Sequence, residues 1–249
     1  MRATVRKPTQ PVPSSNVGAR VDALKWPQIT EELDAHGCAL LKRLLTPDEC
    51  RAIASLYPDD AHFRSRIVMS RHGFGRGEYK YFSYPLPELI AGLRPLIYAR
   101  LKDVADRWNE AMGINIRYPD RHEAFLKRCH DAGQTRPTPL LLQYEAGDYN
   151  CLHQDLYGEH VFPLQVAILL SEPGRDFTGG EFVLTEQRPR MQSRAEVMPL
   201  AQGDGVVFAV HYRPVQGTRG TYRVNMRHGV SRIRSGRRHT LGVIFHDSK

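Results

Sequence analysis

The sequence predicts an α+β domain in which helices come first and a jelly-roll-like β core follows. Before about residue 131, apolar side chains recur at three- and four-residue steps, which indicates helices. From Pro139 onward the chain becomes a series of short extended runs separated by Gly, Pro and Asp, the spacing of an antiparallel sandwich or barrel. A chain of 249 residues can bury one sizeable core. We therefore expect one domain, with the helices covering one sheet.

The first residues differ in composition from the rest. Residues 1–20 are rich in Pro, Ser and basic side chains and hold few large apolar ones. They predict a disordered basic arm, and they lack the apolar run of a secretory signal. Residues 21–249 are then expected to form the single domain.

Short elements follow this arm. Ile29 and Leu33 suggest a short helix, and Cys38–Leu45 is typical of a strand. Thr46 is a good helix N-cap, Pro47 fits the first helical turn, and Glu49 completes a capping box, so a helix is predicted to begin there.

The middle of the chain contains the longest predicted helix. Phe63–Pro87 interleaves basic and aromatic residues with glycines, which favours strands or loops. Leucines and other apolar residues then recur from Leu89 to Trp108, so the longest helix lies here and ends near Gly113. A shorter helix is predicted from Asp120 to Asp131.

Seven strands are predicted for the β core, which spans about residues 139–247. They are Leu140–Tyr144, Val161–Leu170, Glu181–Thr185, Glu196–Leu200, Val206–His211, Tyr222–His228 and His239–His246.

Charge and cysteine content limit the class of protein. The net charge of +8 admits nucleic acid or another polyanion as a partner. The four cysteines form no Cys-x-x-Cys pair, so we expect reduced thiols in a cytoplasmic protein. No apolar run approaches the roughly 18 residues of a membrane span, and nothing in the sequence indicates the oligomeric state.

Three residues stand out as candidate metal ligands. His153 and Asp155 are two positions apart at the mouth of a strand-like segment, and His228 lies in a second such segment. Two imidazoles and one carboxylate can close a facial triad, the arrangement typical of non-haem Fe(II) oxygenases.

Other residues compete for the same role. His211 and His246 could each replace His228 as the distal ligand, although neither is followed ten positions later by a basic residue at a strand start. Cys151 would share a face with His153 in an extended strand and is a conceivable fourth ligand.

Two more residues are predicted to face the same site. Arg238 follows His228 by ten positions. On an adjacent antiparallel strand it would lie deeper in the barrel, where its guanidinium can bind a carboxylate in a bidentate manner. Strand alternation sends only one of Arg237 and Arg238 inward, and motif spacing favours Arg238. Tyr144, on the strand entering the site, can offer a hydroxyl to the same ligand.

Together these residues resemble the 2-oxoglutarate/Fe(II)-dependent oxygenases of the double-stranded β-helix fold, over about residues 139–247. Residues 129–165, with PRMQSRAEV and the run after residue 213, look more narrowly like a bacterial family of that superfamily supposed to act on damaged nucleic acid. The matching pieces are Tyr144…His153-x-Asp155, Gly179-Gly180-Glu181-Phe182, Gly203-Asp204 before Val206-Val207-Phe208, and His228-x-Val230…Gly236-x-Arg238.

The resemblance implies a cupin-like double-stranded β-helix core and a dioxygenase that uses Fe(II), 2-oxoglutarate and O2. His153, Asp155 and His228 would bind the iron, and Arg238, helped by Tyr144, would bind the distal carboxylate of 2-oxoglutarate. Such an enzyme converts 2-oxoglutarate to succinate and CO2 while it hydroxylates, or thereby demethylates, its substrate. No catalytic residue beyond the metal ligands is implied.

The substrate is left open among several classes. The segment Arg64–Tyr84 offers cations for phosphates and rings for bases, which favours single-stranded nucleic acid. A protein side chain, a small metabolite and a lipid are the alternatives. Leu142 stands where the nucleic-acid demethylase branch usually has asparagine, and the ten-residue spacing from His228 to Arg238 looks more like the prolyl-hydroxylase branch.

Two other classes of protein fit parts of the pattern. A cupin-like protein would bind a metal without 2-oxoglutarate chemistry. A non-catalytic basic binding module would merely retain the metal-site residues, and retention of all three together with Arg238 argues against it.

Overall fold

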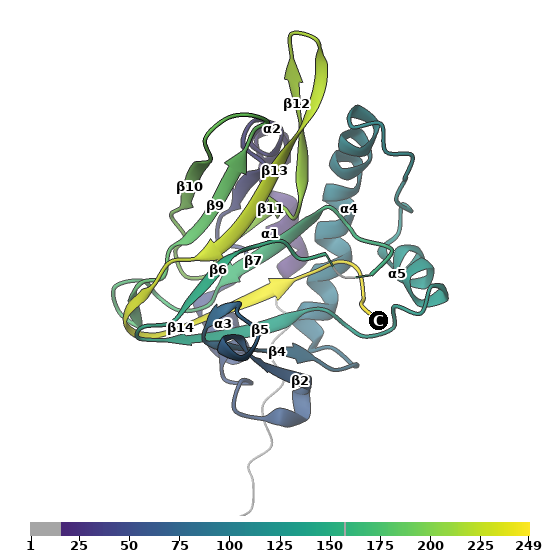
Figure 1. Cartoon of the computed structure of the whole chain (residues 1–249). Helices are drawn as coiled ribbons and strands as arrows, with labels where there is room; N and C mark the ends of the chain where they lie inside the picture. Colours follow the sequence, from purple (N-terminus) through teal and green to yellow (C-terminus); the bar gives the residue numbers. More distant parts are fainter. Residues whose placement is uncertain (1–15, 157) are drawn as a thin grey trace, which may run out of the picture.

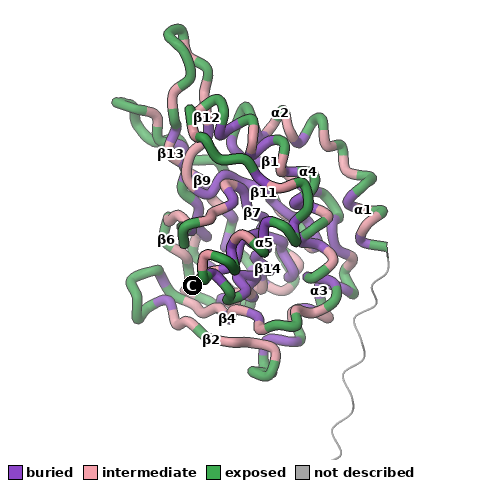
Figure 2. Tube along the Cα trace, turned by 90° about the vertical axis from the view of Figure 1, so that its right-hand side faces the viewer, coloured by how far each residue is buried: buried purple, intermediate pink, exposed green. Residues whose placement is uncertain are grey.

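Two antiparallel β-sheets face each other in the structure, a computed structural model that describes residues 16–156 and 158–249 (Figure 1). Figure 2 shows that the buried residues concentrate in the interior strands and on the inner sides of the helices. Consecutive strands can belong to different sheets, because β13 lies in the smaller sheet and β14 in the larger one.

The larger sheet has eight strands in the order β1-β11-β7-β14-β5-β4-β2, with β8 paired to β14. Strands β7 and β14 lie near its centre, and each is paired on both sides. The strands are β1 (Cys38–Leu41), β2 (Phe63–Val68), β4 (Glu78–Phe82), β5 (Leu140–Glu145), β7 (Leu164–Leu169), β8 (Phe177–Gly179), β11 (Gly205–Ala209) and β14 (Ile233–Val243).

The smaller sheet has six strands in the order β10-β9-β13-β6-β3, with β12 paired to β13. Its longest member, β13, extends beyond the body of the protein with β12 as a projecting hairpin (Figure 1). The strands are β3 (Gly75–Arg76), β6 (Tyr149–His153), β9 (Phe182–Gln187), β10 (Arg194–Met198), β12 (Tyr212–Gly217) and β13 (Gly220–Val230).

Helices pack on the larger sheet, as predicted. Helix α2 contacts β1 and β11, α3 contacts β14, and α4 packs against both α1 and α5. None of the helices in the described residues is long and apolar enough to cross a membrane. The helices are α1 (Val17–Ala23), α2 (Trp26–His36), α3 (Pro47–Ala54), α4 (Glu88–Ala111) and α5 (His122–Asp131).

The predicted start of α3 is confirmed by its hydrogen bonds. The Thr46 hydroxyl accepts from the backbone N–H of Glu49 at 3.2 Å, and the Glu49 carboxylate accepts from the backbone N–H of Thr46 at 2.8 Å. This reciprocal capping box satisfies two N–H groups that the first turn leaves without helical partners. The predicted long helix and the helix that follows it are confirmed as α4 and α5.

The boundary of the predicted disordered arm is wrong at its C-terminal end. Residues 17–20 belong to α1, because Val17 and Val21 are buried in the core cluster that includes α4 and Arg20 forms an ion pair with buried Glu49 at 2.6 Å. The remainder of the predicted arm, residues 1–15, lies outside the described residues.

The β core also begins earlier than residue 139. Strands β1, β2 and β4 complete the larger sheet, so the N-terminal half contributes strands as well as helices. Two core strands are longer than predicted. The run predicted as Tyr222–His228 is part of the β12–β13 hairpin, and β14 starts at Ile233 instead of His239. Charged, solvent-facing residues such as Arg234 and Arg237 obscure the strand pattern, although the backbone there pairs with β8 and β5.

Candidate active site

The three predicted metal ligands come together on the smaller sheet. His153 is the last residue of β6, His228 lies in β13, and the antiparallel register places these two residues opposite each other. Asp155 follows just after β6 ends, where the chain has left the sheet and its carboxylate lies beside both rings. Pairing of β6 with β13 therefore unites residues that are far apart in the sequence.

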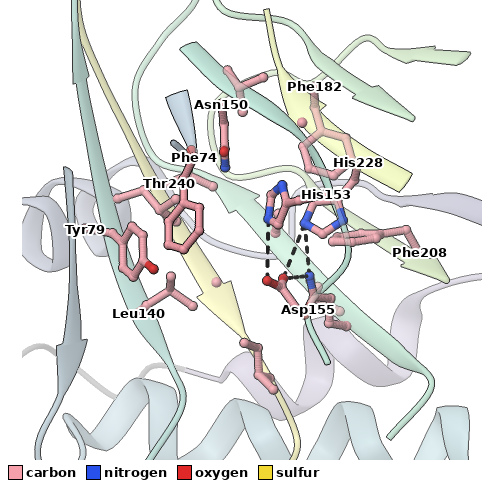
Figure 3. A pocket seen from close by; sticks show the side chains of 18 of the residues that line it. Phe74, Tyr79, Leu140, Asn150, His153, Asp155, Phe182, Phe208, His228 and Thr240 are labelled. Carbon is pink, nitrogen blue, oxygen red and sulfur yellow. Dashed lines mark hydrogen bonds and ion pairs between the residues drawn. The ribbon is translucent and has the colours of Figure 1, made fainter. Parts of the chain in front are cut away.

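The Asp155 carboxylate contacts both imidazoles (Figure 3). Its Oδ1 lies 3.4 Å from Nε2 of His153, and its Oδ2 lies 3.3 Å from Nε2 of His228. One donor atom from each residue lies within 4.8 Å of the other two, and no second group of this kind occurs in the described residues. Two imidazole nitrogens and one carboxylate oxygen at this spacing can hold one divalent metal ion.

Hydrogen bonding sets the tautomer of His153. Its Nδ1 donates to the carbonyl oxygen of Cys151 at 2.8 Å, which leaves Nε2 for a metal. Burial disfavours the charged imidazole, but the hydrogen bond and charge of Asp155 outweigh burial and raise the pKa of His153. Burial alone would raise the pKa of Asp155. The hydrogen bonds and charges of both histidines instead hold that pKa well below its usual range, so the carboxylate is ionised at neutral pH.

His228 is enclosed by aromatic rings. The ring centroids of Phe208 and Phe182 lie 4.5 and 6.0 Å from that of His228. Burial is the main reason why the pKa of His228 is lowered, which favours the neutral, metal-binding form of the ring. Its Nδ1 is buried and has no hydrogen-bond partner among the described residues.

The sequence reasoning missed one contact of this site, the side chain of Gln165 on β7. Its Nε2 lies 2.6 Å from Oδ2 of Asp155 and 3.3 Å from Nε2 of His228. The available signal was a single amide inside the otherwise apolar run FPLQVAILL, because a polar residue in a fully buried strand needs a polar partner.

Arg238 lies on the opposite sheet, which corrects the prediction that its strand is adjacent to that of His228. Strand β13 ends at Val230, and the chain then crosses to the larger sheet, where β14 pairs with β5, β7 and β8. The register sets Arg238 opposite Tyr144 of β5, with the guanidinium carbon 5.7 Å from the ring centroid. Both residues are buried and line the cavity from the wall facing the metal-ligand candidates.

The guanidinium of Arg238 is buried without a counter-ion. Only 1% of the residue is exposed, and no carboxylate of the described residues lies within ion-pair distance. Nη1 donates to the Thr240 hydroxyl at 2.5 Å, whereas Nε has no acceptor. Burial lowers the pKa of Arg238 to about 10. Its neighbour Arg237 points to solvent and pairs with Glu145 at 2.7 Å, as strand alternation predicts.

A cavity of about 320 Å³ lies between the two sheets and contains all five predicted site residues. Its mouth and walls are mainly apolar, with Phe74, Tyr79 and Tyr81 among the aromatic side chains. Five buried side-chain polar atoms in the described residues have no hydrogen-bond partner, and four of them belong to residues that line this cavity. These four are Tyr144 Oη, Gln165 Oε1, His228 Nδ1 and Arg238 Nε. Asn150 also lines the cavity, and burial raises the pKa of the Tyr144 hydroxyl by more than its interaction with Asn150 lowers that pKa.

The alternative ligands do not join the group. His211 stacks on Tyr212 with ring centroids 3.6 Å apart, and Nδ1 of His246 accepts the backbone N–H of Phe162. Cys151 is exposed, and its carbonyl oxygen, not its thiol, contacts His153.

Comparison with known sequences identifies relatives. A family model named Oxygenase-NA, described as an oxygenase catalysing oxidative methylation of damaged DNA, matches residues 77–248. Two uncharacterized proteins of Mycobacterium tuberculosis are each 51% identical to the chain over 167 residues, which is 67% of this chain and 72% of theirs.

Solved structures share the fold at low sequence identity. A prolyl hydroxylase from Trichoplax adhaerens aligns with a TM-score of 0.56 and 13% identity, covering 90% of this chain and 89% of that one. A prolyl-4-hydroxylase from Pseudomonas putida aligns with a TM-score of 0.51 and 16% identity, covering 87% and 96%. The two facing sheets are thus the double-stranded β-helix that the sequence predicted. The extended match to the family model and the 51% identical relatives show that the chain belongs to the Oxygenase-NA family of oxygenases.

Proposed function

We propose that the chain is a 2-oxoglutarate- and Fe(II)-dependent dioxygenase. In this proposal His153, Asp155 and His228 bind the Fe(II), and Arg238, helped by Tyr144, binds the distal carboxylate of 2-oxoglutarate. The observation that carries this assignment is the concentration of partnerless buried polar atoms in one cavity. Buried polar groups in folded proteins almost always have partners, so exceptions that converge on one space indicate ligands that complete them.

The metal assignment is supported by the donor set. Neutral imidazoles and a carboxylate are the ligands of non-haem Fe(II) oxygenases, in which one face of the metal stays open for other ligands. The ionised state of Asp155 and the Nδ1–H tautomer of His153 both present lone pairs to one point.

The assignment of Arg238 is supported by its missing counter-ion. A buried guanidinium without a carboxylate partner is unfavourable, and a dicarboxylate ligand would supply that partner in bidentate geometry. The Tyr144 hydroxyl, whose pKa is raised by burial, remains protonated and can donate a further hydrogen bond. The alternative of a cupin-like metal protein leaves the guanidinium unexplained.

The residues of the chain would bind and orient the ligands and exclude water from the site. When bound, Fe(II) and 2-oxoglutarate supply O2 activation, with succinate and CO2 as products and a hydroxyl group transferred to the substrate. Phe182 and Phe208 hold the His228 ring, and the apolar cavity walls keep bulk water from the reacting groups.

We infer that the substrate is a nucleic acid. The description of the family names damaged DNA, and the cavity carries aromatic side chains on which a base can stack. Arg71 and Arg76, which flank Phe74 in the sequence, are exposed and provide cations for phosphates. A protein side chain is the second candidate, favoured by the ten-residue spacing between His228 and Arg238. The four free cysteines fit the cytoplasmic location predicted from the sequence.

Succinate formation tests the cofactor assignment directly. Protein reconstituted anaerobically with Fe(II) is exposed to O2 and 2-oxoglutarate without a prime substrate, and succinate is measured. We expect slow turnover in the unaltered chain and none in Asp155→Ala or Arg238→Met. The neighbouring variant Arg237→Met serves as the control and should retain turnover. Retained turnover in Asp155→Ala would refute the assignment of the ligands.

The same assay, run with candidate substrates, tests the substrate class. Methylated single-stranded oligonucleotides and peptides are each added at equal concentration. Stimulation of succinate release by an oligonucleotide, together with a mass change of that oligonucleotide, is the expected result. Stimulation by a peptide alone would favour the second candidate.

A further inference from the structure

Gln165 contacts the metal-ligand candidates from the opposite wall of the cavity. It lies in β7, which is hydrogen-bonded to β11 on one side and to β14 on the other. Only 5% of Gln165 is exposed, and all the remaining residues of β7 are apolar. A residue needed only to fill this space would not be an amide, because burial leaves its Oε1 without a partner.

The identity of the amide atoms follows from chemistry. The atom that faces Asp155 lies 2.6 Å from a carboxylate oxygen, so it must be the donating nitrogen, since two acceptor oxygens at that distance would repel. The same nitrogen lies 3.3 Å from Nε2 of His228, which can accept when the ring is neutral and carries its proton on Nδ1. One amide group thus engages two of the three donor atoms of the proposed metal site.

The positions of Asp155 and Gln165 in the fold allow this hydrogen bond to orient the Asp155 carboxylate. The carboxylate belongs to a segment that has left β6 and makes no strand pairing, whereas Gln165 projects from a strand paired on both sides. A hydrogen bond from a rigid strand restricts the rotation of a carboxylate that its own backbone would not fix. Partners of this kind orient metal ligands and commonly change metal affinity by 10- to 100-fold.

We propose that Gln165 is a positioning residue that orients the Asp155 carboxylate for the metal by donating a hydrogen bond to Oδ2. This inference rests on the proposed metal site. The hydrogen bond holds Oδ2 on the side of Gln165, while Oδ1 lies 3.4 Å from Nε2 of His153, and it ties the larger sheet to the ligands of the smaller one.

Co(II) binding tests this role without turnover. Co(II) is titrated into the metal-free full chain, and both the dissociation constant and the ligand-field absorption spectrum are recorded. In Gln165→Met, which keeps the length of the side chain but has no donor, we expect Co(II) to bind 10- to 100-fold more weakly and with an altered spectrum. In Gln202→Met, which removes a half-buried amide bonded to the Leu170 carbonyl at 2.8 Å, affinity and spectrum should stay within two-fold of the unaltered chain.

A second variant, Gln165→Asn, tests whether the length of the side chain matters as well as its polarity, and it replaces Gln165→Met if that variant does not fold. Gln165→Asn retains an amide but is one methylene shorter, so it should also bind Co(II) weakly with an altered spectrum. Affinity and spectrum equal to the unaltered chain in both Gln165 variants would overturn the positioning role. If Asp155→Ala loses Co(II) while the Gln165 variants do not, the metal site stands and this inference fails. Absence of Co(II) binding by the unaltered chain would overturn both.

Discussion

Replacement of Arg238 by methionine should have two effects of opposite sign. The guanidinium is buried without a counter-ion, and its pKa falls from the ordinary 12.5 to about 10. A difference of 2.5 pKa units corresponds to about 3.4 kcal/mol at about 1.36 kcal/mol per unit. Loss of the hydrogen bond to Thr240 offsets roughly 1 kcal/mol of this. Without 2-oxoglutarate, Arg238→Met should therefore unfold at higher denaturant, with a free energy of unfolding raised by about 2 kcal/mol.

Binding of 2-oxoglutarate should change in the other direction. Truncation of one partner in a buried charged hydrogen-bonded pair typically costs about 2–5 kcal/mol, which is a loss of roughly 30-fold or more in affinity. Calorimetric titration of the anaerobic Fe(II) protein with 2-oxoglutarate measures this loss, and urea unfolding of the ligand-free protein measures the gain in stability.

The neighbouring Arg237 provides a matched control. Its side chain is 60% exposed and pairs with the exposed Glu145, so Arg237→Met should change stability and 2-oxoglutarate affinity little. Lower stability of Arg238→Met combined with unchanged affinity for 2-oxoglutarate would refute the reasoning, since it would mean that the guanidinium serves the fold instead of the ligand.

Three further predictions concern stability and substrate. Fe(II) at 100-fold above its Kd should stabilise the protein by about 2.7 kcal/mol, 2-oxoglutarate at 100-fold above its Kd for the Fe(II) protein should add about the same, and a chelator should reverse the rise in melting temperature. Burial, with a smaller contribution from nearby Arg94, lowers the pKa of both His122 and His246 to about 4. The unfolded chain therefore binds more protons than the folded chain between pH 6.5 and 4. The free energy of unfolding should decrease as the pH is lowered through that window, by up to about 1.4 kcal/mol per pH unit for each histidine, and urea midpoints that do not change with pH would contradict this. Arg76→Glu should weaken binding of a single-stranded oligonucleotide and reduce its salt dependence, whereas Arg219→Glu at the tip of the β12–β13 hairpin should not. Equal losses of oligonucleotide affinity in the two variants would argue against binding of the oligonucleotide near Arg76.

The sequence allowed the metal-ligand candidates to be predicted because their chemistry is local and distinctive. His153 and Asp155 are close in the chain, and His228 sits in a segment with a clear strand pattern. The choice of Arg238 over Arg237 followed from alternation and spacing. The capping box at Thr46 was equally local, since two residues three positions apart determine it.

What could not be predicted depends on pairing between distant strands. No feature of the sequence between His228 and Arg238 indicates that the chain crosses from one sheet to the other between β13 and β14. The contact of Gln165 with Asp155 likewise exists only because β7 faces the end of β6 across the cavity. The hairpin extension was hidden by its charged and polar residues, which resemble a loop in composition.

The division of the site between two sheets has a consequence for ligand binding. The metal-ligand candidates belong to the smaller sheet, whereas Tyr144, Gln165 and Arg238 project from the larger sheet on which the helices pack. A metal ion held by the first wall and a dicarboxylate held by the second would meet in the cavity, so each ligand bound would bring the walls into the arrangement that the other requires. Because linkage is reciprocal, the factor by which metal strengthens 2-oxoglutarate binding equals the factor by which 2-oxoglutarate strengthens metal binding. The hydrogen bond from Gln165 to Asp155 is a direct side-chain connection across this gap, which gives a physical reason for a polar residue in a strand that is otherwise apolar.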